Sequence, residues 1–366
     1  MDFKGKKGLR IAVVGSGISG ILSAYLLQHQ HQVTLFEKDD YFGGHTHTVV
    51  IPGGPDAGTP VDTGFIVLNQ RTYPNFIKFL TQLEVEKSPT DMSFSYFCQA
   101  SGHYYSSRNL NGWFAKRSNI LNPKFWRFLY EMADFVKTLR KEYLADRLAD
   151  VTLSTYLAQK GLHGEAIDHF IIPMAAAIWS GSDFQLGQFP IRTFAQFYEN
   201  HGLLAVSGHP PWFFVKGGSH SYVKAFLASF KGKAFKSTAV TRVVRENETV
   251  TLHFKDDDPQ VFDAVVMATH ADQALKLLEH PSESEQRLLG AWTYSQNRTY
   301  LHTDTRVMPP KQRAWASWNY TRLKEADPQS PVTVTYDMTR LQNLKTSKPY
   351  LVTLNQEIDK QHILRE

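Results

Sequence analysis

Residues 9–20, with the sequence LRIAVVGSGISG, decide the fold of this chain. The run begins with short apolar and β-branched residues, which are typical of a buried parallel strand. The glycines that follow, Gly15, Gly17 and Gly20, have the spacing G-x-G-x-x-G. The first permits a tight turn, the second lets the backbone approach a pyrophosphate, and the third lets the next helix pack closely on the strand. That helix, expected over residues 18–28, points its first N–H groups at the phosphates.

A second strand is expected at residues 32–36, and it ends at Glu37. Glu37 lies 22 positions after Gly15, close to the offset of about 20 residues at which an acid binds a ribose hydroxyl. Its carboxylate would repel a 2′-phosphate, which argues against NADP. A lone glycine triad also occurs as a chance turn in α/β proteins. The triad with its strand, helix and acid instead predicts a Rossmann-type dinucleotide site.

The residues after Glu37 favour FAD over NAD. Residues 38–48, KDDYFGGHTHT, carry a double glycine and resemble the FAD signature of amine oxidases, protoporphyrinogen oxidases and carotenoid desaturases. Further segments resemble elements of that superfamily, and they occur in the expected order. They are PVDTGF at 60–65, FFVKGGS at 213–219, AVTRVV at 239–244 and FDAVVMATH at 262–270. The chain as a whole is most similar to bacterial NAD/FAD-binding oxidoreductases that are associated with cyclopropane or furan fatty-acid metabolism.

The motifs and the resemblance together imply FAD as the cofactor. The residues expected to bind it are Gly15, Gly17, Ile18, Ser19, Gly20, Glu37, Lys38, Gly43, Gly44, His45, Thr63, Gly64, Gly217, Gly218, Val240, Val243, Ala268 and Thr269. A second G-x-G-x-x-G does not occur in the sequence. Electrons are therefore expected to leave the flavin to oxygen, a quinone or a partner protein.

The resemblance implies an α/β fold, in which an α+β substrate domain is inserted into a Rossmann-type FAD-binding domain. The FAD-binding domain is expected at 1–70 and 205–290, and the substrate domain at 71–204 and 291–366. Helical patterns occur at 73–83, 123–147, 153–160, 165–179 and 193–200. Strand patterns occur at 93–98, 103–106, 314–320, 332–337 and 350–355, and the last three are expected to roof the substrate cavity.

Two residues are candidates for catalysis. His45 follows the double glycine, where many relatives carry a basic residue against the flavin or its pyrophosphate; His47 is less expected to contact the cofactor. Lys216 precedes the second double glycine, so its ammonium could stabilise an anionic reduced flavin. The alternatives are a hydrogen-bonded loop histidine for His45 and a solvated surface lysine for Lys216.

Aromatic residues make up 13% of the chain, enough to line a large apolar cavity. An aromatic cage for an amine, or the walls of an acyl-chain site, could come from Trp179, Trp212, Phe214, Trp315 and Trp318. Core packing is the alternative for each of them. The 15 histidines show no H-E-x-x-H pattern, so no metal site is expected.

Composition favours a cytoplasmic protein. The single cysteine, Cys98, cannot form an intrachain disulfide, which fits a reducing compartment. No apolar run reaches the length of a membrane span. The net charge is +5, but the basic residues form no long run, so nucleic acid is not an expected partner. Peripheral membrane contact and a homodimer are left open.

Three functions are compatible with the sequence. The first is an FAD-dependent oxidoreductase that transfers hydride to flavin from a small apolar substrate, with a fatty-acyl compound as one candidate. The others are a flavin amine oxidase and a flavin-binding scaffold without turnover. After residue 250 the only glycine is Gly290, although relatives close the flavin ring with a glycine-rich C-terminal segment. That segment is expected to be missing, which predicts weak flavin binding, unless residues 314–320 cover the ring.

Overall fold

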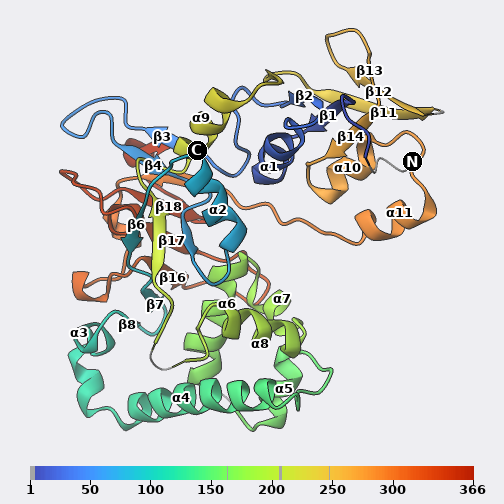
Figure 1. The fold of residues 1–366 in the computed structure, drawn as a ribbon. Coiled ribbons are helices and arrows are strands. Elements are labelled where there is room, and N and C mark those ends of the chain that lie inside the picture. The colour runs from blue at the N-terminus through green and yellow to red at the C-terminus, as the bar shows by residue number, and fades with distance from the viewer. Residues whose placement is uncertain (1–4, 163, 206–207, 247) are drawn as a thin grey trace.

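The computed structural model of the chain describes residues 5–162, 164–205, 208–246 and 248–366. Figure 1 shows the N-terminal strands β1 and β2 with helix α1 at one end of the molecule and helices α3 to α8 at the opposite end. The largest sheet lies between these ends. Among the described residues, no helix is both long enough and apolar enough to cross a membrane.

The first sheet is parallel and has the strand order β10-β2-β1-β14. Its bounds are β10 (Lys233–Phe235), β2 (Gln32–Phe36), β1 (Arg10–Val14) and β14 (Ala264–Met267), and α1 spans Ile18–Leu27. The interior residues of β1 are buried on both faces, as a central parallel strand requires. The strand expected at 32–36 and the helix expected at 18–28 are both confirmed. The sheet joins residues near the N-terminus to residues 199 and 253 positions later; the discontinuous domain and its bounds stay a prediction.

An antiparallel meander covers one side of this sheet. It consists of β11 (Val240–Glu246), β12 (Thr249–Phe254) and β13 (Gln260–Phe262). Its buried residues Val243, Leu252 and Phe262 share a core cluster with Phe36 of β2. Helices α10 (Ala271–Leu277) and α11 (Glu283–Gly290) follow β14.

The largest sheet has seven strands in the order β19-β15-β18-β17-β16-β7-β8. The bounds are β19 (Ile363–Arg365), β15 (Thr299–His302), β18 (Leu351–Leu354), β17 (Val334–Asp337), β16 (Trp318–Arg322), β7 (Phe94–Cys98) and β8 (His103–Ser106). Neighbouring strands are antiparallel except β7 and β16, which run parallel. Four of the five expected strands are confirmed within two residues at each end.

The strand expected at 314–320 is partly wrong. A 3-10 turn, Gln312–Ala314, occupies its start, and β16 begins only at Trp318. Side chains bond the N–H groups of Ala316 and Ser317 before β16, while the Ser317 carbonyl oxygen accepts from Asp337 N–H of β17 at 2.9 Å. Ala316 N–H donates to Asn319 Oδ1 at 2.9 Å, and Ser317 N–H donates to Ser93 Oγ at 3.1 Å. Side-chain acceptors therefore take the place of the ladder for these two N–H groups.

Helices form the layer on one face of this sheet. Their bounds are α3 (Leu110–Trp113), 3-10 helix η1 (Arg117–Leu121), α4 (Pro123–Leu144), α5 (Leu153–Gln159), the π-helical turn Ile167–Ile171, α6 (Ile172–Trp179), α7 (Asp183–Gly187) and α8 (Ile191–Asn200). The expected helical segments are confirmed, including α2 (Pro74–Gln82). Phe125 and Phe128 of α4 pack with Phe94 and Tyr96 of β7 in one core cluster.

Two small sheets connect the ends of the molecule. One pairs β3 (Thr48–Val50) with β4 (Pro60–Asp62), and the other has the order β5 (Val67–Asn69), β9 (Trp212–Val215), β6 (Lys87–Thr90). Helix α9 (His220–Ser229) follows β9, and α12 (Met338–Leu341) follows β17. These short elements carry the remaining glycine motifs.

Candidate functional site

The glycine loop between β1 and α1 faces open space. A Cβ built on Gly17 meets no described atom within 4 Å, whereas one built on Gly20 would lie 1.9 Å from the carbonyl oxygen of Gly15. Gly20 therefore packs the helix against the loop, and Gly17 leaves room beside it. Ile18 and Ser19 begin α1, and both are exposed. This is the cradle that a pyrophosphate requires.

Glu37 is buried and holds the glycine loop in place. Its Oε2 accepts hydrogen bonds from the N–H of Ser16 at 2.9 Å and from Ser16 Oγ at 2.5 Å, and its Oε1 accepts one from Asp39 N–H at 3.0 Å. A carboxylate has capacity for about four hydrogen bonds, so Oε1 can still accept one from a ribose hydroxyl. Lys38 beside it is exposed.

Three glycine motifs meet at this loop. A Cβ on Gly44 would lie 3.0 Å from Gly17 Cα, and a Cβ on Gly64 would lie 2.0 Å from the carbonyl oxygen of His45. Gly43 N–H donates to Ser16 Oγ at 3.1 Å. The backbones of the glycine loop, the double glycine and the Thr63-Gly64 turn thus pack directly on one another. The structure brings together segments that the sequence separates.

The two histidines after the double glycine have different surroundings. The His45 ring is exposed and stacks on His270 with centroids 5.5 Å apart, and His270 in turn stacks on Tyr294 at 4.4 Å. The Nδ1 of His47 is 2.6 Å from Thr63 Oγ1, and burial lowers the pKa of His47. His45 therefore lies beside the glycine loop with its ring accessible. Its catalytic role stays a prediction; His270 ends the FDAVVMATH motif, and no sequence signal identified Tyr294.

Ala268 and Thr269 lie against the glycine loop, and the two expected valines do not. Ala268 Cβ is 3.3 Å from a Cβ built on Gly20, and Thr269 Cγ2 is 3.3 Å from one built on Gly15. The Val243 side chain is 1% exposed and packs in the core of the meander, while Val240 is half-buried beside it. Any contact of Val243 with FAD would have to come from its backbone.

Asp62, the aspartate of the PVDTGF motif, joins three distant segments. Its buried carboxylate accepts hydrogen bonds from the N–H and Oγ of Ser219, from Thr48 Oγ1 and from Gln342 Nε2, at 2.5 to 3.0 Å. Burial raises the pKa of Asp62 to about 6, and the donated hydrogen bonds oppose this. Ser219 follows Gly217 and Gly218 directly. Asp62 thus fixes the second double glycine relative to β4 and α12.

The side chain of Lys216 is exposed to solvent and is not buried at this site. Its Nζ is 2.6 Å from Glu86 Oε2, and the two side chains are 64% and 70% exposed. The pKa of Lys216 is raised by its hydrogen bond and ion pair with that carboxylate. This placement matches the solvated surface lysine and gives no support to a catalytic role.

A cavity of about 1000 Å³ lies between the helical layer and the edges of two sheets. Val67 of β5, Phe94 of β7 and Met174 of α6 line it, and most of its other lining residues are apolar or aromatic. Its charged lining residues are Asp91 and Arg108, whose Oδ2 and Nε are 3.4 Å apart.

The five tryptophan and phenylalanine residues proposed as a cage do not all meet at this cavity. Trp212 and Trp318 line it. Trp179 packs against Phe189 and the aromatic residues of α8 instead. Phe214 is buried in β9, and the Trp315 Nε1–H donates to the carbonyl oxygen of Pro309 at 2.8 Å. Only two of the five side chains are therefore placed to contact a ligand there.

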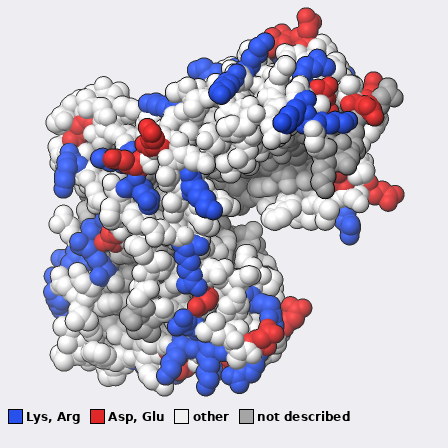
Figure 2. Space-filling view, in the orientation of Figure 1, with Lys and Arg blue, Asp and Glu red and all other residues white. Residues whose placement is uncertain are grey.

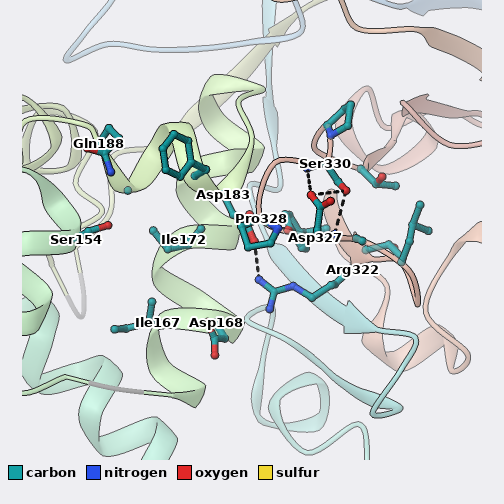
Figure 3. Close-up of a pocket in the computed structure, with 18 of the residues that line it drawn as sticks. Ser154, Ile167, Asp168, Ile172, Asp183, Gln188, Arg322, Asp327, Pro328 and Ser330 are labelled. Atoms are coloured by element: carbon teal, nitrogen blue, oxygen red, sulfur yellow. Dashed lines mark hydrogen bonds and ion pairs between the residues drawn. The ribbon is translucent and has the colours of Figure 1, made fainter.

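A second cavity, of about 650 Å³, is lined by residues of α5 and α7 and by the connection from β16 to β17 (Figure 3). Arg322 Nη2 is 2.7 Å from Asp183 Oδ2 within it, and Tyr320 Oη donates to Asp183 Oδ1 at 3.1 Å. Phe184 N–H donates to the Pro328 carbonyl oxygen at 2.8 Å and ties the connection between β16 and β17 to α7. The Arg322–Asp183 ion pair therefore links β16 of the sheet to helix α7 at this cavity.

No metal centre is evident in the described part of the chain, where no group of three or more His, Cys, Asp or Glu side chains could hold an ion. Cys98 is buried and free. The glycine loop with Glu37 could therefore hold a cofactor, and the large cavity could hold a substrate.

Residues 18–353 match the model of the flavin containing amine oxidoreductase family. Several solved structures have the same fold. The CLA-producing fatty acid isomerase from P. acnes aligns over 98% of this chain and 79% of its own, with 15% identity and a TM-score of 0.64. Putrescine oxidase bound to putrescine aligns over 95% and 75%, with 16% identity and a TM-score of 0.63. An oxidoreductase from Methanosarcina mazei aligns over 96% and 80%, with 15% identity and a TM-score of 0.64.

Proposed function

The chain belongs to the family of flavin-containing amine oxidoreductases, with FAD as its cofactor, and we propose that it oxidises an apolar, fatty-acyl substrate in the large cavity. The residues of the glycine loop fit the cofactor, because Gly17 leaves open space beside a helix N-terminus and Glu37 keeps acceptor capacity for a ribose hydroxyl. When bound, the flavin supplies the hydride acceptor.

The lining of the large cavity is the observation that carries this proposal. Its volume of about 1000 Å³ is at the upper end of the range for small-molecule sites. Apolar and aromatic side chains cover most of it, so a long alkyl chain would bury its apolar surface there. The guanidinium of Arg108, which is 48% exposed, offers N–H donors to a carboxylate at one end.

The cavity also adjoins the segments that the family motifs assign to the flavin. Val67 lies on β5, just after the Thr63-Gly64 turn, and Trp212 lies on β9, just before Gly217 and Gly218. A substrate in the cavity would be held by these strands and shielded from water by the helical layer. In the reaction the substrate loses two electrons and two protons. The bound flavin would supply the acceptor for one hydrogen as hydride, the other would leave as a proton to solvent, and oxygen or a quinone would take up the electrons.

Anaerobic reduction of the FAD-loaded protein tests the proposal. Fatty acids of graded chain length should bleach the visible flavin bands, and Ala133→Phe, which places a ring into the large cavity from α4, should slow that bleaching without releasing FAD. The matched control is Ala158→Phe, which places the same ring into the second cavity and should leave the rate unchanged. Equal effects of the two substitutions would argue against the large cavity as the substrate site.

Amine oxidation is the second candidate, because Trp212 and Trp318 both line the large cavity and indole rings bind ammonium groups. A panel of mono- and diamines, assayed for flavin reduction and hydrogen peroxide, separates it from fatty-acyl oxidation. Bleaching by amines alone would replace the fatty-acyl proposal. Tight FAD binding with no reduction by either class would favour the scaffold function.

A further inference from the structure

We propose that the surface formed by α3, η1 and the first turns of α4 docks on an anionic lipid bilayer and opens the large cavity towards it. We name this surface the docking patch and define it by the exposed apolar side chains Leu110, Ile120, Leu121, Trp126 and Tyr130. Its use in substrate delivery rests on the proposed apolar substrate. The binding to lipid is a separate property that can be measured without flavin.

The apolar side chains of the docking patch are unusually exposed. The exposed fractions are 76% for Leu110, 87% for Leu121 and 71% for Tyr130, with 51% for Trp126 and 46% for Ile120. Clustered apolar exposure of this kind marks surfaces that bind a partner or a membrane. It does not come from a loosely packed helix, because Phe125 and Phe128 on the other face of α4 are 1% exposed.

Local contacts hold the docking patch together as one surface. The Trp126 Nε1–H donates to the Ile120 carbonyl oxygen at 2.9 Å, and the rings of Trp126 and Phe114 have centroids 5.2 Å apart. The side chain of Asn122 accepts a hydrogen bond from Lys124 N–H and so caps α4 directly after η1. The elements that carry the exposed side chains are therefore fixed relative to one another.

Positive charge surrounds the docking patch. Residues 108–130 contain five basic residues, no Asp and no Glu, so this segment carries as much positive charge as the whole chain has net charge, +5. These residues are Arg108, Lys116, Arg117, Lys124 and Arg127. Figure 2 shows Lys and Arg, with some Asp and Glu among them, along the lower edge of the molecule, where α4 lies in Figure 1.

Two of these basic residues are partly neutralised, by Asp91 on Arg108 and by Glu131 on Arg127. Arg117 and Lys124 take part in no ion pair with any residue that the structure describes. Apolar side chains that project between unpaired cations suit an anionic bilayer surface. The apolar side chains would enter the boundary of the acyl chains, and the cations would contact the anionic headgroups.

The large cavity opens within the docking patch. Arg108, Leu110 and Trp126 line the cavity and are also exposed, so they form part of its mouth. An apolar substrate dissolved in a bilayer could enter there without crossing water. This continuity between mouth and patch distinguishes a bilayer from an acidic protein or a nucleic acid as the occupant.

Co-sedimentation with vesicles tests the inference, with phosphatidylcholine alone compared to phosphatidylcholine mixed with phosphatidylglycerol. The protein should sediment with the mixed vesicles, and added salt should release it. Replacing both Arg117→Gln and Lys124→Gln should weaken this binding by about 25-fold, since each basic residue near an anionic surface contributes about 1 kcal/mol and 1.4 kcal/mol is tenfold. Leu121→Ser should also weaken it, through lost apolar burial.

Matched controls lie elsewhere on the surface. Arg287→Gln with Lys345→Gln removes the same charge, and Leu288→Ser, at a leucine that is 59% exposed, removes a similar apolar group. The inference is overturned if wild type shows no preference for anionic vesicles, if the controls lose as much binding as the patch variants, or if a DNA duplex binds while vesicles do not. FAD affinity measured on the same proteins keeps the two proposals apart. Vesicle binding without FAD binding would refute only the proposed function.

Discussion

Replacing Asp62→Asn should change how the stability of the protein depends on pH. The carboxyl pKa rises from an ordinary 3.8 to about 6 on folding because Asp62 is buried. A group of this kind contributes stability that is fully present below pH 4 and is lost as the pH rises through 6, since the folded state binds the proton more tightly than the unfolded chain does. The difference between the unfolded pKa of 3.8 and the folded pKa of about 6 corresponds to about 3 kcal/mol in the free energy of unfolding.

Asparagine cannot ionise, so the variant escapes that loss. It carries a cost that does not depend on pH, because its amide N–H₂ would face a donor such as Gln342 Nε2 in place of a carboxylate oxygen. We expect the free energy of unfolding of the variant, minus that of wild type, to rise by about 2.5 kcal/mol between pH 4 and pH 7.5. Taking the difference cancels the titration of groups that the substitution leaves alone.

Urea unfolding of both proteins across that pH range provides the measurement. A difference that stays constant with pH would mean that the carboxyl pKa is the same in both states. A difference that falls as pH rises would mean that the donors on Asp62 outweigh its burial and lower the pKa. Thr48→Val removes one of those donors, so it should move the pH-dependent step to higher pH.

Four further predictions concern the glycine motifs and two charged residues. Gly17→Val should abolish FAD binding in absorbance titrations while the melting temperature holds, because its side chain would fill the open space beside the loop; a yellow, fully loaded variant would refute the loop as the phosphate site. Gly64→Ala should destabilise the protein by roughly 2 to 4 kcal/mol in urea unfolding, because its Cβ would lie 2.0 Å from the His45 carbonyl oxygen. Gly53→Ala, where a Cβ meets no described atom, is its control. Glu37→Ala should weaken FAD by about 1 to 3 kcal/mol through lost charge-assisted hydrogen bonds, and an unchanged dissociation constant would contradict that. Lys216→Met should leave flavin reduction unchanged, because the lysine is in an exposed ion pair; a large loss of rate would restore its catalytic role.

Local patterns predicted most of the secondary structure, and the exceptions have tertiary causes. The strand at 32–36 and the helix before Gln28 are confirmed because their signals, an apolar run and a glycine triad, act within a few residues. The segment at 314–317 has strand-like composition, but its backbone is bonded by Asn319 and Ser93 side chains. A single sequence does not show which distant side chain will compete for a backbone group.

Candidate site residues divide in the same way. Lys216 was proposed from its position before a double glycine, and the structure pairs it with Glu86, which lies 130 positions earlier. Of the five aromatic residues considered for a cage, Trp212 and Trp318 come from different sheets, and only the folded arrangement turns both towards one cavity. Residue type predicted what these side chains could do, and the fold decided where they point.

The sequence by itself determined the dinucleotide-binding unit, its order of motifs and its α/β class. It could do so because glycine is required where two backbones pack in direct contact, since any side chain would clash there. The tertiary structure alone decided that Asp62 would join Ser219 to Gln342, that His45 would stack on His270, and that the cavity would open beside Leu110. These contacts connect residues many positions apart, and burial and side-chain direction are set only when the separate elements pack.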